Sequence, residues 1–176
     1  MSILHPLIQE SLPILQRTPP VLNTLLRDLP DAWTSATEGP GTWSPYDVVG
    51  HLIHGEKADW MVRIEIILEH GPDRPFDPFD REAQFRESQG KTMNQLLDEF
   101  MEIRKNNLEK LIGFNLQAEQ LELKGMHQVL GFVTIRHLIG TWTAHDMAHL
   151  LQISRVMAKR YRDEAGPFAQ FLSVIQ

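Results

Sequence analysis

The stretch TWTAHDMAHLLQ, residues 141–152, is the most informative about the fold of this chain. Its apolar residues belong to a pattern spaced by three or four positions, which lies on one face of an α-helix. That face comprises Leu138, Trp142, His145, His149, Ile153 and Val156. Because the apolar members predict a face turned to the core, His145 and His149 should also point inward, side by side. Two such histidines indicate a shared binding partner.

A metal ion is one partner that suits two adjacent buried histidines. An unpaired buried polar group costs on the order of 1–3 kcal/mol. A divalent cation removes this cost, because both rings stay neutral and donate lone pairs to one centre. The four-residue spacing of His145 and His149 is also that of helical zinc sites. The alternative is a spacing that arose by chance.

A metal site needs a further ligand, and the stretch VGHLIHGE, residues 49–56, offers two. Helical periodicity modestly favours His51, which shares a face with apolar neighbours, over His54. Gly55, one turn beyond His51, would leave room for a metal or a substrate. A core histidine bonded to a carbonyl group stays open as the other interpretation of His51.

The segment HDMAH, residues 145–149, also has the HExxH spacing of zinc peptidases. Asp146 replaces the glutamate general base, and its side chain is shorter by one methylene group. Arg155 stands where metzincins carry a further histidine. Both departures argue against a peptidase, so Asp146 is expected instead to orient a ring or a neighbouring helix.

Other side chains are candidates for supporting the site. Gln152, one turn beyond His149, is on the same face and could hydrogen-bond a ligand. Trp142, one turn before His145, is expected in the core or the pocket wall. Glu56 is expected on the helix surface, with a supporting role at the site as the alternative.

Helical periodicity dominates the whole chain, and no alternating strand of useful length is evident. Helices are predicted over 2–28 (broken or bent near Thr18-Pro19-Pro20), 44–70, 92–112 and 134–162. Ser44 with Asp47, and Thr92 with Gln95, predict the caps of the middle two. The fold class is therefore all-α, a four-helix bundle forming a single domain over residues 1–176, and its core is a natural metal site.

The connectors are less regular. Residues 71–90 form a long insert with three phenylalanines, Phe76, Phe79 and Phe85, which we expect to be a packed loop, with a lid over the site as the alternative. Residues 113–133 are expected to be a linker. His127, within this linker, is not expected at the site.

Composition narrows the function classes. The chain has 176 residues, a formal net charge of −6, and no cysteine. The absence of cysteine excludes disulfides and a thiolate nucleophile within the chain. The sequence has no cluster of Lys and Arg that would favour nucleic-acid binding. No apolar run approaches the ~20 residues of a membrane span, and the first residues lack the pattern of a signal peptide. We therefore expect a cytoplasmic protein with no nucleic-acid or membrane partner.

Residues 42–64 (TWSPYDVVGHLIHGEKADWMVRI), 74–83 (RPFDPFDREA), 127–168 and 171–175 together resemble the DinB-like superfamily of damage-inducible bacterial proteins, which includes bacillithiol transferases. The resemblance implies a four-helix bundle with a three-histidine metal site. One ligand lies in a motif like GHLxxxE and two in a motif like HDxxHxxQ. In this chain they are His51, His145 and His149, which decides between His51 and His54.

The resemblance also implies a divalent ion, with zinc or nickel favoured, and a homodimer. Three imidazoles leave a coordination position open, which is typical of catalytic sites. We therefore expect a metal-dependent enzyme acting on a small molecule, either a transferase of a low-molecular-weight thiol supplied from outside or a hydrolase. The alternatives are a non-catalytic metal- or ligand-binding stress-response bundle and a structural dimer whose histidines are empty.

Overall fold

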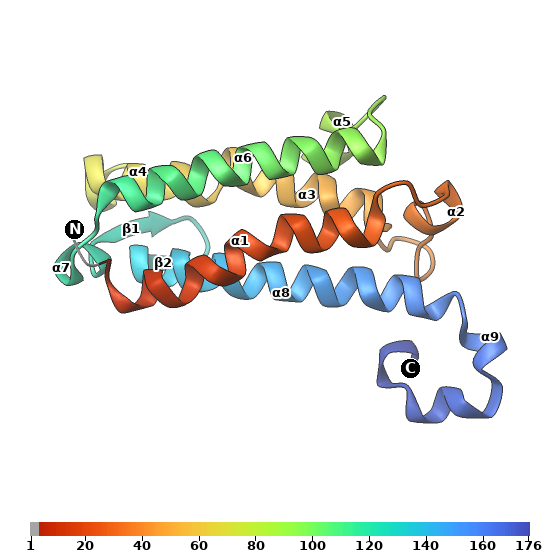
Figure 1. The fold of residues 1–176 in the computed structure, drawn as a ribbon. Coiled ribbons are helices and arrows are strands. Elements are labelled where there is room, and N and C mark those ends of the chain that lie inside the picture. The colour runs from red at the N-terminus through yellow and green to blue at the C-terminus, as the bar shows by residue number, and fades with distance from the viewer. Residues whose placement is uncertain (1–3) are drawn as a thin grey trace.

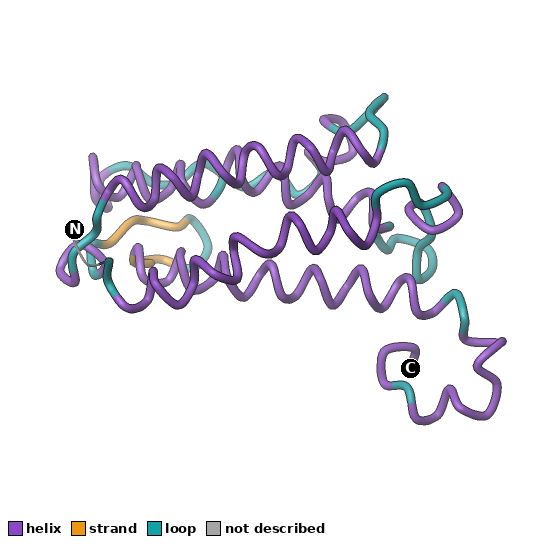
Figure 2. Tube along the Cα trace, viewed as in Figure 1, coloured by secondary structure: helices purple, strands orange, loops and turns teal. Residues whose placement is uncertain are grey.

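Four long helical rods make up the bundle in the computed structural model, which describes residues 4–176 (Figures 1 and 2). They are α1 (Pro6–Leu26), α3 (Pro45–Ala58) continued by α4 (Trp60–His70), α6 (Met93–Phe114) and α8 (Ile135–Lys159). Helices α1 and α8 lie side by side, and α6 packs against both α1 and α3 (Figure 1). The predicted four-helix bundle is confirmed.

Local sequence signals set where the middle helices begin. The Ser44 side chain accepts a hydrogen bond from the Asp47 backbone, and the Asp47 side chain accepts one from the Ser44 backbone. Thr92 and Gln95 form the same reciprocal pair at the start of α6. These capping boxes satisfy backbone donors that a helix start would otherwise leave free. Both predicted starts are therefore confirmed.

The prediction of one unbroken helix over 44–70 is wrong. Asp59, with φ −114° and ψ −82°, separates α3 from α4. Its carboxylate forms an ion pair with Arg63, four residues on, at 2.7 Å. Asp59 and Arg63 are both buried, and both line the cavity described below.

Of the break or bend predicted near Thr18-Pro19-Pro20, the break is absent, because α1 runs through all three residues. A proline inside a helix leaves the carbonyl four residues earlier without its backbone donor. For Pro19 that carbonyl belongs to Leu15, and Arg104 of α6 donates to it at 2.8 Å. A side chain from the neighbouring helix thus replaces the missing bond.

The linker over 113–133 contains a β-hairpin, which contradicts the expectation that the chain has no strand of useful length. Strand β1 (Lys124–His127) pairs antiparallel with β2 (Gly131–Thr134), so that Lys124 faces Thr134 and His127 faces Gly131. Each strand has only four residues. A run this short shows too few alternations to be recognised from sequence.

Short elements fill the remaining connectors. They are α2 (Asp31–Thr34), η1 (Gly71–Asp73), α5 (Ala83–Glu87), α7 (Ala118–Leu121), α9 (Arg162–Ala165), η2 (Gly166–Phe171) and η3 (Ser173–Ile175). The last three curl away from the end of α8 in Figure 1, and η3 returns to contact α8. None of the helices described over residues 4–176 has the length and apolarity needed to cross a membrane.

The core consists of two hydrophobic clusters, one on each side of the middle of the bundle. One contains Leu15, Trp60, Leu108 and Trp142, and the other contains Leu22, Ile53, Phe100 and Ile153. On α3, α6 and α8 the residues between the two clusters include buried charged groups, namely Glu56, Arg104 and Asp146. The candidate site lies at this polar level.

Candidate metal site

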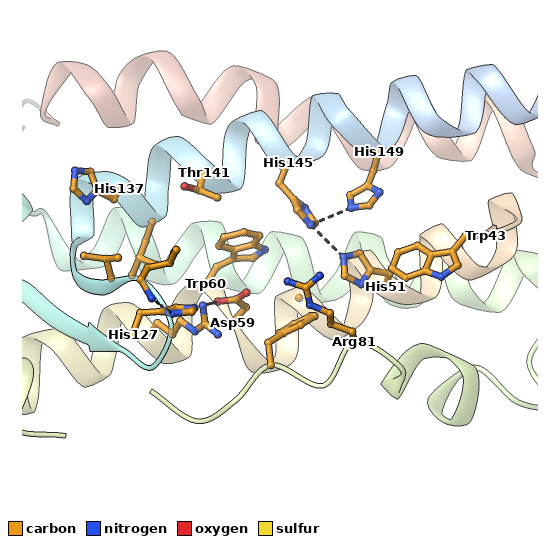
Figure 3. A pocket seen from close by; sticks show the side chains of 16 residues that line it. Trp43, His51, Asp59, Trp60, Arg81, His127, His137, Thr141, His145 and His149 are labelled. Carbon is orange, nitrogen blue, oxygen red and sulfur yellow. Dashed lines mark hydrogen bonds and ion pairs between the residues drawn. The ribbon is translucent and has the colours of Figure 1, made fainter. Parts of the chain in front are cut away.

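Three histidine rings from two helices converge inside the bundle (Figure 3). His51 comes from α3, and His145 and His149 come from successive turns of α8. The Nε2 atom of His145 lies 3.2 Å from Nε2 of His51 and 3.0 Å from Nε2 of His149. One ring nitrogen from each residue lies within 4.8 Å of the others. The predicted trio therefore shares one small volume.

These spacings are those of nitrogens around a metal ion. Two nitrogens bound to a tetrahedral ion at 2.0–2.1 Å are about 3.3 Å apart, close to the two Nε2 distances. His54, the other candidate on α3, is not part of the group. Its Nδ1 atom contacts Oε1 of Glu87 at 3.1 Å instead.

Protons alone cannot satisfy the three nitrogens. Gln152 Oε1 lies 2.8 Å from His149 Nδ1, and because an amide oxygen only accepts, that Nδ1 carries the proton. The Nε2 atom of a neutral His149 is then a bare lone pair. The Nε2 atom of His145 contacts Nε2 of both His51 and His149, and it carries one proton at most, so it can donate to only one of them. A cation at this point accepts all three lone pairs, so the residues fit a divalent metal.

Burial keeps the rings neutral, as metal ligation requires. Desolvation, with the nearby charge of His149 as the next cause, lowers the pKa of His51 to about 4 and that of His145 to about 3. Burial also lowers the pKa of His149, whereas its bond to Gln152 acts in the opposite direction. At neutral pH the cluster therefore presents lone pairs rather than positive charge.

Aromatic side chains surround the histidines. Trp43 stacks on His149 with an interplanar angle of 12°, and its ring centroid lies 4.8 Å from that of His51. Trp60 meets His145 edge to face at 5.2 Å, and Phe79 meets His51 in the same way at 5.6 Å. These rings hold the imidazoles in place and exclude water from part of their surface.

A buried ionic network lies behind the histidines. Arg104 makes two hydrogen bonds to Asp146, at 2.6 and 2.9 Å, and one to Glu56 at 2.9 Å. Glu56 also accepts from Trp142 Nε1 at 2.9 Å and from Asn107 at 2.8 Å. Burial raises the pKa of Glu56, and Arg104 opposes that rise. The network joins α3, α6 and α8 at the level of the site.

Four residues are candidates from sequence for supporting the site, and the structure agrees with the prediction for some of them and not for others. Gln152 contacts His149, as expected of a residue on the site face. Asp146 bonds a neighbouring helix rather than a histidine ring. Glu56 is 3% exposed, so the surface position expected for it is wrong: its carboxylate is neutralised by Arg104. Trp142 is a core residue and does not line the cavity.

The histidines form one wall of a cavity of about 480 Å³. Gly55 lines it, as its small size predicted, and Phe79 lines it, which agrees with the lid given as the alternative to a packed loop. No sequence pattern predicted the other lining residues Trp43, Asp59, Arg63 and Arg81. His127, from the hairpin, lines the opposite end with His137, contrary to expectation (Figure 3). Phe76 is buried in the core, and Phe85 packs near Trp43.

Comparison with known proteins identifies the family. The sequence profile of the DinB superfamily matches residues 14–153, which include all three histidines. The chain belongs to the DinB superfamily. No curated protein matches the sequence.

A solved structure supports the same fold for this DinB protein. YfiT from Bacillus subtilis, a probable metal-dependent hydrolase with an unusual four-helix bundle topology, is 18% identical. The similarity covers 87% of each chain with a TM-score of 0.75. At this identity the likeness establishes the arrangement of the helices.

Proposed function

We propose that this DinB protein is a divalent-metal-dependent hydrolase of small molecules. The observation that carries the proposal is the convergence of three neutral ring nitrogens at the wall of the cavity. His51, His145 and His149 would hold the ion, and the family resemblance favours zinc or nickel, both of which accept imidazole ligands. When bound, the ion would act as a Lewis acid that polarises the bond to be cleaved.

The chain supplies a proton acceptor in Asp59. It is the only carboxylate that lines the cavity among residues 4–176. Burial raises its pKa, whereas Arg63 lowers it, and the net shift is upward. A carboxylate with a raised pKa is a stronger base than one on the surface. Asp59 therefore takes the proton from the attacking water, and Arg63 fixes its orientation.

The similarity to YfiT supports hydrolysis over the other chemistry expected of the family, thiol transfer. The aromatic lining favours substrates with an apolar part. The cavity volume of about 480 Å³ suits a small molecule rather than a folded protein.

The test compares metal-free, zinc-loaded and nickel-loaded protein on a panel of small esters, amides and lactones. We expect turnover only with metal. Asp59→Asn should lower kcat by roughly 10²-fold or more while metal content is retained. Asp73→Asn, which removes an exposed carboxylate outside the cavity, is the matched control.

Three outcomes would contradict the proposal. Consumption of a small thiol with a haloarene, without hydrolysis of any ester, would assign thiol transfer instead. Bound metal with no turnover of either panel would assign a non-catalytic metal-binding bundle. Equal rates for the wild type and Asp59→Asn would remove Asp59 from the reaction.

A further inference from the structure

Arg81 brings an unpaired positive charge into the cavity. The other arginine that lines it, Arg63, forms an ion pair with Asp59, and Arg86 of the same insert pairs with Asp80. Within residues 4–176, the Arg81 guanidinium makes no hydrogen bond or ion pair. A guanidinium directed into a cavity without a carboxylate partner is suited to an anion from outside the chain.

Figure 3 shows where this charge lies. The side chain of Arg81 rises from the insert between α4 and α5 toward the histidine cluster, and its guanidinium lies beside His51. Arg81 and His51 both line the same cavity. An anion bound at Arg81 is therefore held next to the three histidines.

The charges of the lining leave a net positive cavity. Asp59 and Arg63 neutralise each other, so Arg81 is the fixed charge that remains. Apart from Thr141, the rest of the lining near the histidines is apolar, with Trp43, Trp60 and Phe79 as its aromatic members. The site thus offers one anion-binding group and flat apolar walls within about 480 Å³.

We infer that the cavity binds small organic anions with an apolar body, and that Arg81 binds their carboxylate or phosphate group. A guanidinium presents paired N–H donors that match two oxygens of either group. The apolar body lies against the aromatic walls. The inference concerns the substrate class of the hydrolase proposed above, but the binding contact itself involves Arg81 rather than the metal.

The test measures binding of three matched probes: 4-phenylbutyrate, 4-phenylbutyl phosphate and 4-phenylbutanol. Quenching of tryptophan fluorescence reports occupancy, because Trp43 and Trp60 line the cavity. Wild type, Arg81→Gln, Arg81→Lys and Arg74→Gln are titrated metal-free and zinc-loaded. Arg74 is the matched control, since it is an exposed arginine of the same insert outside the cavity lining.

We expect metal-free wild type to bind at least one anionic probe roughly tenfold more tightly than the alcohol, as a charge-assisted hydrogen bond predicts. Arg81→Gln should lose this preference, Arg81→Lys should keep part of it, and Arg74→Gln should keep it all. Preference for only one anionic probe would identify the anion as carboxylate or phosphate.

Equal affinity of the alcohol and both anionic probes, or an anion preference that survives in Arg81→Gln, would overturn the inference. A preference that appears only with zinc and ignores Arg81 would assign anion binding to the ion, which overturns the inference and leaves the proposed hydrolase standing. An Arg81-dependent anion preference in a protein that binds no zinc would support the inference and overturn the proposed hydrolase.

Discussion

Single residues could be predicted where helical periodicity fixes the direction of a side chain. His145 and His149 lie on an apolar face of α8, so their inward position follows from spacing alone. Arg104 carries the same signal, since it lies four residues from both Phe100 and Leu108 on the buried face of α6. Trp43 and Arg81 come from connectors, whose placement depends on contacts between distant segments.

The buried network leads to a prediction about Arg104. Its side chain is 2% exposed and neutralises two buried carboxylates, Glu56 and Asp146. Arg104→Met would leave both carboxylates without their cation and the Leu15 carbonyl without its donor. We expect a loss of about 3–5 kcal/mol in the free energy of unfolding, measured by urea denaturation.

Lys105→Met is the matched control for that experiment. Lys105 is the next residue along α6, and its side chain is 73% exposed. Its removal should change stability by about 1 kcal/mol or less. Equal effects of the two substitutions would show that the network contributes no more than a surface pair.

At the scale of elements, the long helices were predictable and their interruptions were not. Capping boxes at Ser44 and Thr92 mark helix starts within a few residues, so local sequence is sufficient there. At Pro19 of α1, the backbone donor that the Leu15 carbonyl lacks is replaced by Arg104, which lies in another helix. The hairpin is fixed by packing over the core rather than by its four-residue strands.

Gly125 of β1 leads to a prediction about the hairpin. A Cβ atom there would lie 2.6 Å from Ile67 Cγ1 and 2.6 Å from the Phe76 ring. Both neighbours are buried, so the strand would have to move away from the core. We expect Gly125→Ala to lower the free energy of unfolding by roughly 1–3 kcal/mol, measured by chemical denaturation.

A substitution at Gly140, inside α8, tests whether the stability loss expected for Gly125→Ala is steric. A Cβ atom there meets nothing within 4 Å. Gly140→Ala should be neutral or stabilise by up to about 1 kcal/mol, because alanine favours the helix. The steric account fails if Gly125→Ala proves as benign as Gly140→Ala.

At the scale of the whole molecule, the bundle joins its elements through core packing and a few charged contacts. Glu38, in the connector before α3, binds Arg155 and Lys159 of α8 at 2.6 and 2.7 Å. The exposed apolar surface lies partly on the tail, in Phe168, Phe171 and Leu172. The homodimer implied by the family resemblance stays a prediction.

The Glu38 contact predicts a pH dependence of stability. Its hydrogen bond to Arg155, with Lys159 adding to the effect, lowers the pKa of Glu38 from 4.5 to about 2. The stabilisation is therefore complete above pH 4.5 and is lost as the pH falls toward 2. Glu38→Gln should be less stable than the wild type at pH 7, and this difference should shrink across that range.

Urea midpoints at pH 7, 4 and 3 measure this difference. Glu10→Gln, which removes an exposed carboxylate of α1, should show no comparable pH-dependent gap. A gap for Glu38→Gln that stays constant with pH would show that the ionised carboxylate is not its cause.

We propose that three histidines from two helices hold one cation. The most direct test is elemental analysis of tag-free protein, for the wild type and for His51→Ala, His145→Ala, His149→Ala and His54→Ala. We expect one divalent ion per wild-type chain, its loss in the first three variants and its retention in His54→Ala, which removes a buried histidine outside the cluster. Wild-type protein that takes up no ion, or an ion that survives removal of any of the three, would contradict the proposal.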